Sequence, residues 1–207
     1  LEERYSRLGA YNFYDKSSLT DIAIRQIIDD YALYNDSNLI CQSLAMKKCL
    51  REARNKAKGT NENLLIVGET GTGKTLLAKY IAGLICPADR FITVFSQTRN
   101  ENSIEDDLFG HEAGSFTGVI NRRIGFAEQA DGGVLFFDEF GDIPPLIQQK
   151  LLQLFDREDR SIIRLGGHVR RRLNLTIIAA TNNLEKLLSD DFRKDLLERI
   201  SKVNWIN

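Results

Sequence analysis

Residues 68–75 have side-chain types and a spacing that could bind a triphosphate. Glycines let the backbone curl so that its N–H groups point at phosphate oxygens, and a helix that begins after the loop adds positive potential. The lysine can reach the β- and γ-phosphates, and the final hydroxyl can coordinate Mg²⁺. The alternative is a glycine-rich turn that binds nothing. The run matches the pattern G-x-x-x-x-G-K-[ST] and reads Gly68, Glu69, Thr70, Gly71, Thr72, Gly73, Lys74 and Thr75.

A second group of chemistry-bearing residues follows an apolar run. Residues 134–137 are Val-Leu-Phe-Phe, and Asp138 and Glu139 come next, which is the form of a Walker B segment. In open α/β sheets the carboxyl ends of strands lie at the ligand-binding edge. We expect Asp138 to hold Mg²⁺, directly or through water, and Glu139 to act as general base on the attacking water. The alternative is a strand that ends in a solvated acidic turn.

Polar residues also follow the apolar run at 175–180. Asn182 could sense the γ-phosphate or orient water from the end of that strand. Asn is also a favoured N-cap residue, here for residues 184–188, and the sequence leaves both roles open. The guanine-specificity motif N-K-x-D does not occur, because the run at 55–58 ends in lysine and precedes the phosphate loop. We therefore expect ATP rather than GTP.

Apolar strands that alternate with helices must position these residues. A buried strand at 64–67 precedes the phosphate loop, and Thr75 to about Leu84 follows it with apolar residues at helical spacing. Further strands are expected at 91–95, 134–137 and 175–180, and a small hairpin from 162–165 and 169–173. This alternation predicts an α/β fold with a parallel sheet.

Composition narrows the class of protein. The 207 residues suit one α/β domain with a small appendage, and residues 1–36 are expected to be a linker or the tail of an upstream domain. A net charge of −1 predicts no general affinity for nucleic acid or an anionic membrane. Three cysteines without a C-x-x-C pattern indicate neither a disulfide framework nor a zinc site, which favours a reducing compartment. The basic run at 170–172 is short and could be a solvated hairpin.

Residues 108–119 carry a resemblance to a known family. They read L-F-G-H-E-A-G-S-F-T-G-V and resemble the L-F-G-H-E-x-G-A-F-T-G-A segment of bacterial enhancer-binding proteins, the AAA+ ATPases that activate sigma-54 RNA polymerase. The resemblance continues through 125–139, 178–182 and 192–200, and covers about residues 39–203. It implies a P-loop AAA+ core over residues 37–207, with a three-layer α/β/α architecture, and a cytoplasmic, ATP-hydrolysing protein.

The resemblance also implies roles for a loop and two arginines. It implies that a protruding loop contacts sigma-54, whereas the loop alone would favour a Phe116 that tucks into its own domain. It places Arg193 and Arg199, six residues apart on an expected helix, at the family's arginine-finger positions. Such fingers act on the γ-phosphate of a neighbouring subunit, which implies a ring, usually a hexamer. Without the resemblance they would be surface arginines near a helix end. The loop comprises Gly114, Ser115, Phe116, Thr117, Gly118 and Val119.

Some positions depart from the family pattern. Phe95 stands where the family generally has an asparagine that is thought to hold the Walker B glutamate inactive, and phenylalanine cannot form that hydrogen bond. Ser115 and Val119 replace loop alanines. The sequence ends at Asn207, so we expect the helical lid to be largely absent and DNA to be bound only through a module outside these residues.

These observations favour a transcription-activating ATPase whose 114–119 loop remodels closed sigma-54 polymerase. One alternative is a diverged nucleotide-binding scaffold that assembles without remodelling polymerase. Another is an AAA+ remodeller with a different target.

Overall fold

The computed structural model describes residues 63–95, 101–115, 120–201 and 205–206. The predicted boundary after residue 36 lies outside these residues, as do positions 116–119 of the predicted partner loop. No helix in the described part is both long enough and apolar enough to cross a membrane.

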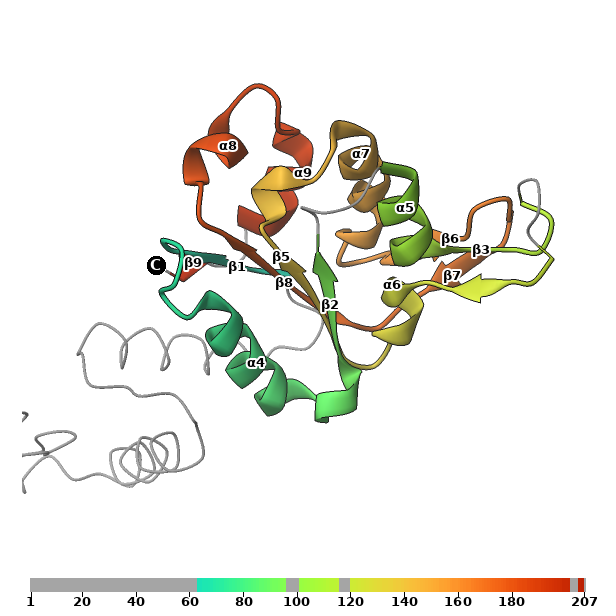
Figure 1. Ribbon diagram of the computed structural model, residues 1–207, viewed down its shortest axis with the longest axis horizontal. Helices are drawn as coiled ribbons and strands as arrows, with labels where there is room; N and C mark the ends of the chain where they lie inside the picture. Colours follow the sequence, from blue (N-terminus) through green and yellow to red (C-terminus); the bar gives the residue numbers. More distant parts are fainter. Residues whose placement is uncertain (1–62, 96–100, 116–119, 202–204, 207) are drawn as a thin grey trace, which may run out of the picture. The chain divides into compact units, whose positions relative to one another are not determined.

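The centre of the fold is a five-stranded sheet in the order β2-β5-β8-β1-β9, and all of its neighbouring strands pair in parallel (Figure 1). The predicted α/β fold with a parallel sheet is therefore confirmed. The two-residue strand β9 was not predicted, because so short a run carries no periodicity. The strands are β1 (Asn63–Val67), β2 (Phe91–Phe95), β5 (Val134–Asp138), β8 (Thr176–Thr181) and β9 (Trp205–Ile206).

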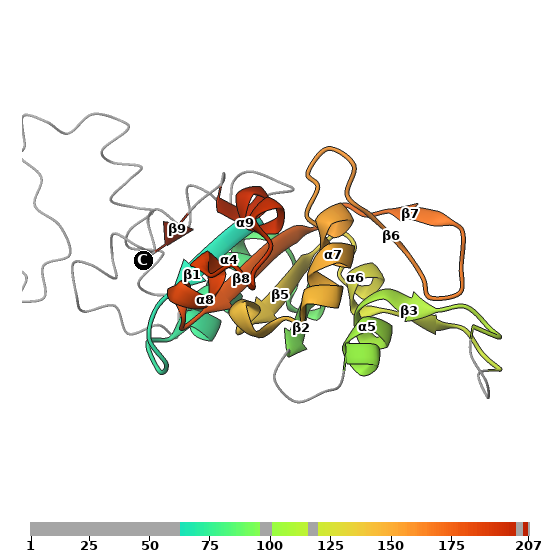
Figure 2. The same cartoon turned by 90° about the horizontal axis from the view of Figure 1, so that it is seen from above.

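The central strands are apolar because both of their faces are covered. All six residues of β8 are buried, and so are the first four of β5. Alternate residues point to opposite faces: Leu65, Leu135 and Ile177 belong to one core cluster with apolar residues of α7 and α9. The helix α4 packs on the other face of the sheet (Figures 1 and 2).

Helices and short 3-10 turns connect the strands. The predicted helix after the phosphate loop is α4 (Lys74–Ile85). The remaining elements are η2 (Ala88–Arg90), α5 (Glu101–Phe109), α6 (Phe126–Gln129), η3 (Phe140–Asp142), α7 (Pro145–Leu154), α8 (Leu184–Leu188) and α9 (Lys194–Ser201).

Two small antiparallel hairpins lie at the same end of the domain in both views (Figures 1 and 2). The predicted hairpin is β6 (Ser161–Ile163) paired with β7 (Arg170–Arg172). A second pair, β3 (Gly110–His111) and β4 (Arg123–Ile124), was not predicted and flanks the 112–122 segment. A bridge between His111 and Leu165 joins the two hairpins.

Candidate nucleotide site

The phosphate loop connects β1 to α4 with the backbone that the glycines were expected to allow. Gly71 and Gly73 have φ angles of 84° and 89°, in the left-handed region that favours glycine. Among the described residues no side chain caps the start of α4, and its first turn carries no acidic residue. The N–H groups at this helix end therefore point to a place where an anion would be stabilised.

Lys74 lies inside the loop that its own backbone helps to form. Its side chain is buried, and Nζ donates to the carbonyls of Gly68 and Glu69, at 3.0 Å each. The Thr72 hydroxyl also donates to the Glu69 carbonyl, at 2.8 Å. These bonds keep the ammonium at the centre of the loop, within reach of any phosphate that the loop holds.

The two candidate metal ligands come from different elements and meet. Thr75 Oγ1, in the first turn of α4, lies 3.5 Å from Oδ2 of Asp138 at the end of β5. Hydroxyl and carboxylate oxygens are the hard ligands that Mg²⁺ prefers. No group of three or more His, Cys, Asp or Glu residues that could hold a metal occurs in the described part of the chain. Because Mg²⁺ prefers six octahedral oxygen ligands, phosphate and water would have to supply ligands beside these two at such a site.

Glu139 follows β5 in an uncommon backbone conformation. Its φ and ψ are both 53°, and it is the only non-glycine residue with a positive φ among the described residues. Its N–H donates to Asp138 Oδ1 at 3.1 Å, and its carbonyl accepts from the N–H of Asp142 at 3.0 Å. Such a conformation costs energy and persists only where the surrounding structure fixes it. The strain lies at the residue predicted to act as general base.

The sequence left two roles open for Asn182: a contact with the phosphate site or the N-cap of the next helix. In the structure, Asn182 and Asn183 each take one of these positions. Asn183 caps α8, because its Oδ1 accepts from the N–H of Lys186 at 3.1 Å. Asn182 Nδ2 instead donates to Thr70 Oγ1 of the phosphate loop, at 3.1 Å. The helix cap therefore falls one residue later than the alternative placed it. The side chain at 182 faces the predicted phosphate site.

Sequence reasoning missed one ion pair beside this site. Lys186 of α8 pairs with Asp142 of η3, the turn that follows Glu139. The hydrogen bond to Asp142 raises the pKa of Lys186, and the charges of Asp142 and Glu139 add to the effect. The partners are 44 residues apart and no motif joins them, so the sequence carried no signal of the contact.

Residues 39–205 match the family model described as the sigma-54 interaction domain. The chain belongs to this family. Together with the parallel sheet and the phosphate loop, the match establishes a P-loop AAA+ core.

Relatives of the chain are named as regulatory proteins of transcription, in accord with this family. The domain is 44% identical over 145 residues to the sigma-54-dependent transcriptional regulator SfnR of Pseudomonas fluorescens, covering 69% of this chain and 39% of that protein. It is 43% identical over 164 residues to the alginate biosynthesis regulatory protein AlgB of Pseudomonas putida, covering 78% of this chain and 36% of that protein. The chain therefore spans well under half the length of these relatives.

A solved structure is similar along almost the whole chain. NtrX from Brucella abortus, in a complex with ATP, matches with a TM-score of 0.68 and 29% sequence identity, covering 99% of this chain and 49% of that one.

In this sigma-54 interaction domain the two predicted finger arginines occupy different environments. Arg193 was predicted to share a helix with Arg199, but it precedes α9, where its N–H donates to Gln148 Oε1 at 2.9 Å. Its carbonyl accepts the first bond of the helix, from the N–H of Leu197. The Arg193 guanidinium pairs with exposed Asp195 at 2.7 Å.

The second arginine is bound more firmly within its own chain. Arg199 donates to the Leu152 carbonyl at 2.8 Å and to Asp156 Oδ2 at 2.7 Å. Burial opposes the effect, but the Arg199 hydrogen bond and two backbone N–H bonds hold the pKa of Asp156 below its usual value. In the described contacts neither arginine touches the phosphate loop of its own chain.

The described part of the predicted partner loop, Gly114 and Ser115, begins at a fixed base. The Arg164 guanidinium is almost fully buried and pairs with Glu128 at 2.6 Å and with Glu112 at 3.0 Å. A Cβ added to Gly166 would lie 2.5 Å from the Cβ of Ser115, so the β6–β7 hairpin closely approaches the loop. Phe116, Thr117, Gly118 and Val119 lie outside the described residues.

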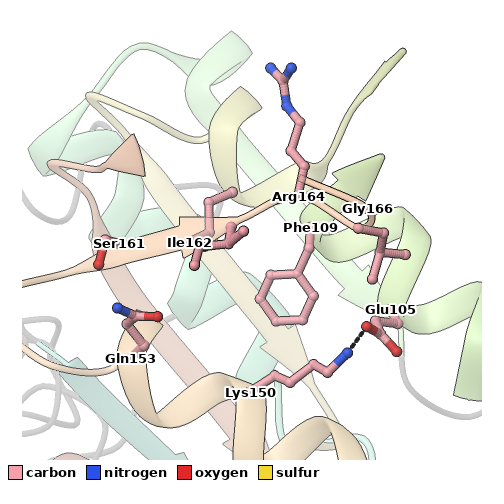
Figure 3. Close-up of a pocket in the computed structure, with 10 residues that line it drawn as sticks. Glu105, Phe109, Lys150, Gln153, Ser161, Ile162, Arg164 and Gly166 are labelled. Carbon is pink, nitrogen blue, oxygen red and sulfur yellow. Dashed lines mark hydrogen bonds and ion pairs between the residues drawn. The ribbon is translucent and has the colours of Figure 1, made fainter. Parts of the chain in front are cut away.

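A cavity of about 320 Å³ lies away from the nucleotide site (Figure 3). Phe109 and Ile162 form apolar walls, and the ion pair of Lys150 with Glu105 crosses one side. The Arg164 guanidinium points away from the cavity, toward its partners at the loop base. The cavity shares no lining residue with the phosphate loop or the Walker B segment.

Proposed function

We propose that this domain hydrolyses ATP with Mg²⁺ and uses the energy to activate sigma-54 RNA polymerase. One observation carries the proposal: Asp138 and Asn182, from the ends of two separate strands, contact the phosphate loop that holds Lys74, in a sigma-54 interaction domain. The likeness to the ATP complex of NtrX supports the choice of nucleotide.

The chemistry follows from the positions of these residues. The loop N–H groups and Lys74 would bind the β- and γ-phosphates, and Thr75 and Asp138 would hold Mg²⁺, which neutralises charge on the phosphates. Glu139 would take the proton of the attacking water, and Asn182 would orient that water or the γ-phosphate. Preorganised groups of this kind stabilise the developing charge without rearranging during the reaction.

Assembly would complete the site. The two arginines, Arg193 and Arg199, lie away from the phosphate loop of their own chain, which supports a role at the site of a neighbouring subunit in a ring, here proposed to be a hexamer. Arg193 would reach a neighbour at lower cost, because its partner Asp195 is exposed, whereas Arg199 would have to exchange the Leu152 carbonyl and Asp156 for phosphate.

The 114–119 loop would transmit to sigma-54 the conformational change that ATP hydrolysis causes in the domain. Its base is fixed by the buried Arg164 and by the close approach of Gly166 to Ser115. A fixed base would transmit a shift of the domain to an apolar tip at Phe116. A cytoplasmic location follows from the proposed target. DNA would be bound by a module outside these residues.

One departure favours a second candidate, a nucleotide-binding scaffold. In the register of β2 and β5, Phe95 lies opposite Asp138, where the family generally has an asparagine. If hydrolysis depended on that asparagine, the chain would bind ATP and assemble without turnover.

The test compares ATP turnover and promoter opening by purified sigma-54 polymerase for three proteins. Glu139→Gln should still bind ATP and lose about 10²–10⁴-fold in turnover, because it removes the general base. Thr117→Ala should keep turnover and lose promoter opening. Turnover equally near zero in wild type and Glu139→Gln would favour the scaffold. Normal opening by Thr117→Ala would contradict the loop assignment, and wild-type turnover without opening would point to another target.

A further inference from the structure

We propose that Lys186 is a positioning residue for Glu139, and that residues 182–186 connect the phosphate loop to the turn that carries this glutamate. The inference rests on the proposed ATPase function and deepens it, because it names a residue outside every motif that would set the geometry of hydrolysis.

Glu139 needs support from its surroundings. Its left-handed backbone, with φ and ψ of 53°, is unfavourable for a residue with a Cβ. The bond from the Asp142 N–H to the Glu139 carbonyl closes the turn that maintains this conformation, at 3.0 Å. The position of Glu139 therefore depends on where Asp142 is held.

Lys186 holds the η3 turn in place. Its Nζ pairs with the Asp142 carboxylate. The first carbon of the same side chain also lies beside the turn, since a Cβ added to Gly141 would meet Lys186 Cβ at 3.5 Å and Thr181 Oγ1 at 3.3 Å. The helix α8 and the η3 turn are neighbours in the fold. Lys186 thus contacts the turn through its charge.

The position of Lys186 is linked to the phosphate loop. The Asn183 side chain accepts from the Lys186 N–H at 3.1 Å and fixes the start of α8. The preceding residue, Asn182, donates to Thr70 of the phosphate loop. One short segment therefore touches the phosphate loop at one end and the Glu139 turn at the other. A shift of Thr70 on phosphate binding would reach Glu139 through four non-covalent contacts: Thr70 with Asn182, Asn183 with Lys186, Lys186 with Asp142, and Asp142 with Glu139.

Lys186 carries the positive charge that its ion pair with Asp142 requires. The hydrogen bond with Asp142 raises the pKa of Lys186, and the nearby charge of Glu139 acts in the same direction. The side chain is therefore an ammonium at neutral pH. The ammonium bonds Asp142 of the turn that follows Glu139, and among the described hydrogen bonds it has none with the phosphate loop.

The experiment compares Lys186→Met, which removes the charge and keeps the stem, with Lys186→Arg, which keeps the charge. Lys194→Met is the matched control, because Lys194 also pairs with an aspartate but both partners are highly exposed. Lys186→Met should lower kcat about tenfold, since small displacements of a catalytic group cost up to about a hundredfold. The affinity for a fluorescent ATP analogue and the thermal unfolding midpoint should not change. Lys186→Arg should restore most of kcat, and Lys194→Met should match wild type.

A double variant separates positioning from a general structural effect. If Lys186 acts through Glu139, Glu139→Gln with Lys186→Met should turn over no more slowly than Glu139→Gln alone, measured in a single turnover. A slower double variant, or a Lys186→Met protein with wild-type kcat, would overturn the role of Lys186 and leave the ATPase proposal intact. Wild-type turnover no faster than Glu139→Gln would overturn both proposals.

Discussion

At the scale of single residues, Lys74 shows how a binding group is held ready. Its ammonium is buried and bonded to two carbonyls of its own loop, Gly68 and Glu69. These partners are neutral, so phosphate oxygens can replace them with a gain, because a cation is attracted more strongly to an anionic oxygen than to a neutral carbonyl. The same side chain thus shapes the loop and supplies its positive charge.

Replacing this lysine should remove nucleotide affinity. Lys74→Ala should weaken ATP binding by on the order of a hundredfold or more, because losing one partner of a buried charge pair costs about 2–5 kcal/mol. Isothermal titration calorimetry measures the effect, and Lys79→Ala, an exposed position of the same helix, is the control. Wild-type affinity in Lys74→Ala would show that the ammonium does not contact the phosphates.

At the scale of elements, the close pairing of β3 with β4 depends on two glycines. A Cβ at Gly110 would lie 2.3 Å from the Arg123 carbonyl oxygen, and a Cβ at Gly125 would lie 2.4 Å from the Phe109 carbonyl carbon. Gly110 also has a φ of 70°. Because the clashes are with backbone, no side-chain rotation relieves them. This pairing sets the separation of the two strands on either side of the predicted partner loop.

Two glycine-to-alanine changes should therefore have opposite effects on stability. Gly125→Ala should lower the free energy of unfolding by about 1–3 kcal/mol, as overpacking of a close contact does. Gly83→Ala, in α4, should raise it by about 0.5–1 kcal/mol, because its Cβ meets open space and alanine favours a helix. Urea unfolding measures both free energies. Equal stability of the two variants would contradict the close backbone contact at Gly125.

At the scale of the whole molecule, the residues proposed to bind phosphate and metal and to act as base lie within one chain, and the two predicted finger arginines do not join them. Arg193 and Arg199 pair with Asp195 and Asp156, and in the described contacts neither reaches the phosphate loop. A net charge of −1 puts little long-range repulsion between copies of this chain. Completion of the site by a neighbour is thus the expected route to full activity.

The ATPase rate per subunit should consequently rise with protein concentration and level off when assembly is complete. Arg193→Ala should lower the plateau by on the order of 10³-fold, the value of an arginine that stabilises transferred phosphoryl charge. Arg157→Ala, at an exposed position, serves as the control. A rate that is independent of concentration, with an active Arg193→Ala protein, would rule out arginines supplied in trans.

The sequence alone determined the phosphate loop, the four long strands of the sheet and the hairpin of β6 and β7. Their signals are local, since glycines at fixed spacing set the loop backbone and apolar runs mark strands that are buried on both faces. The pairing of Thr75 with Asp138 also followed, because parallel strands present their carboxyl ends at one edge.

Tertiary structure alone decided which asparagine caps α8, where Arg193 lies relative to α9, and that Lys186 reaches Asp142. It also decided the positions of the short strands β3, β4 and β9. Each of these depends on backbone direction at a chain reversal or on contacts between segments far apart in the sequence, as in the 44-residue separation of Lys186 and Asp142. Local periodicity carries no information about such contacts, because they are fixed only when the packed sheet brings the segments together.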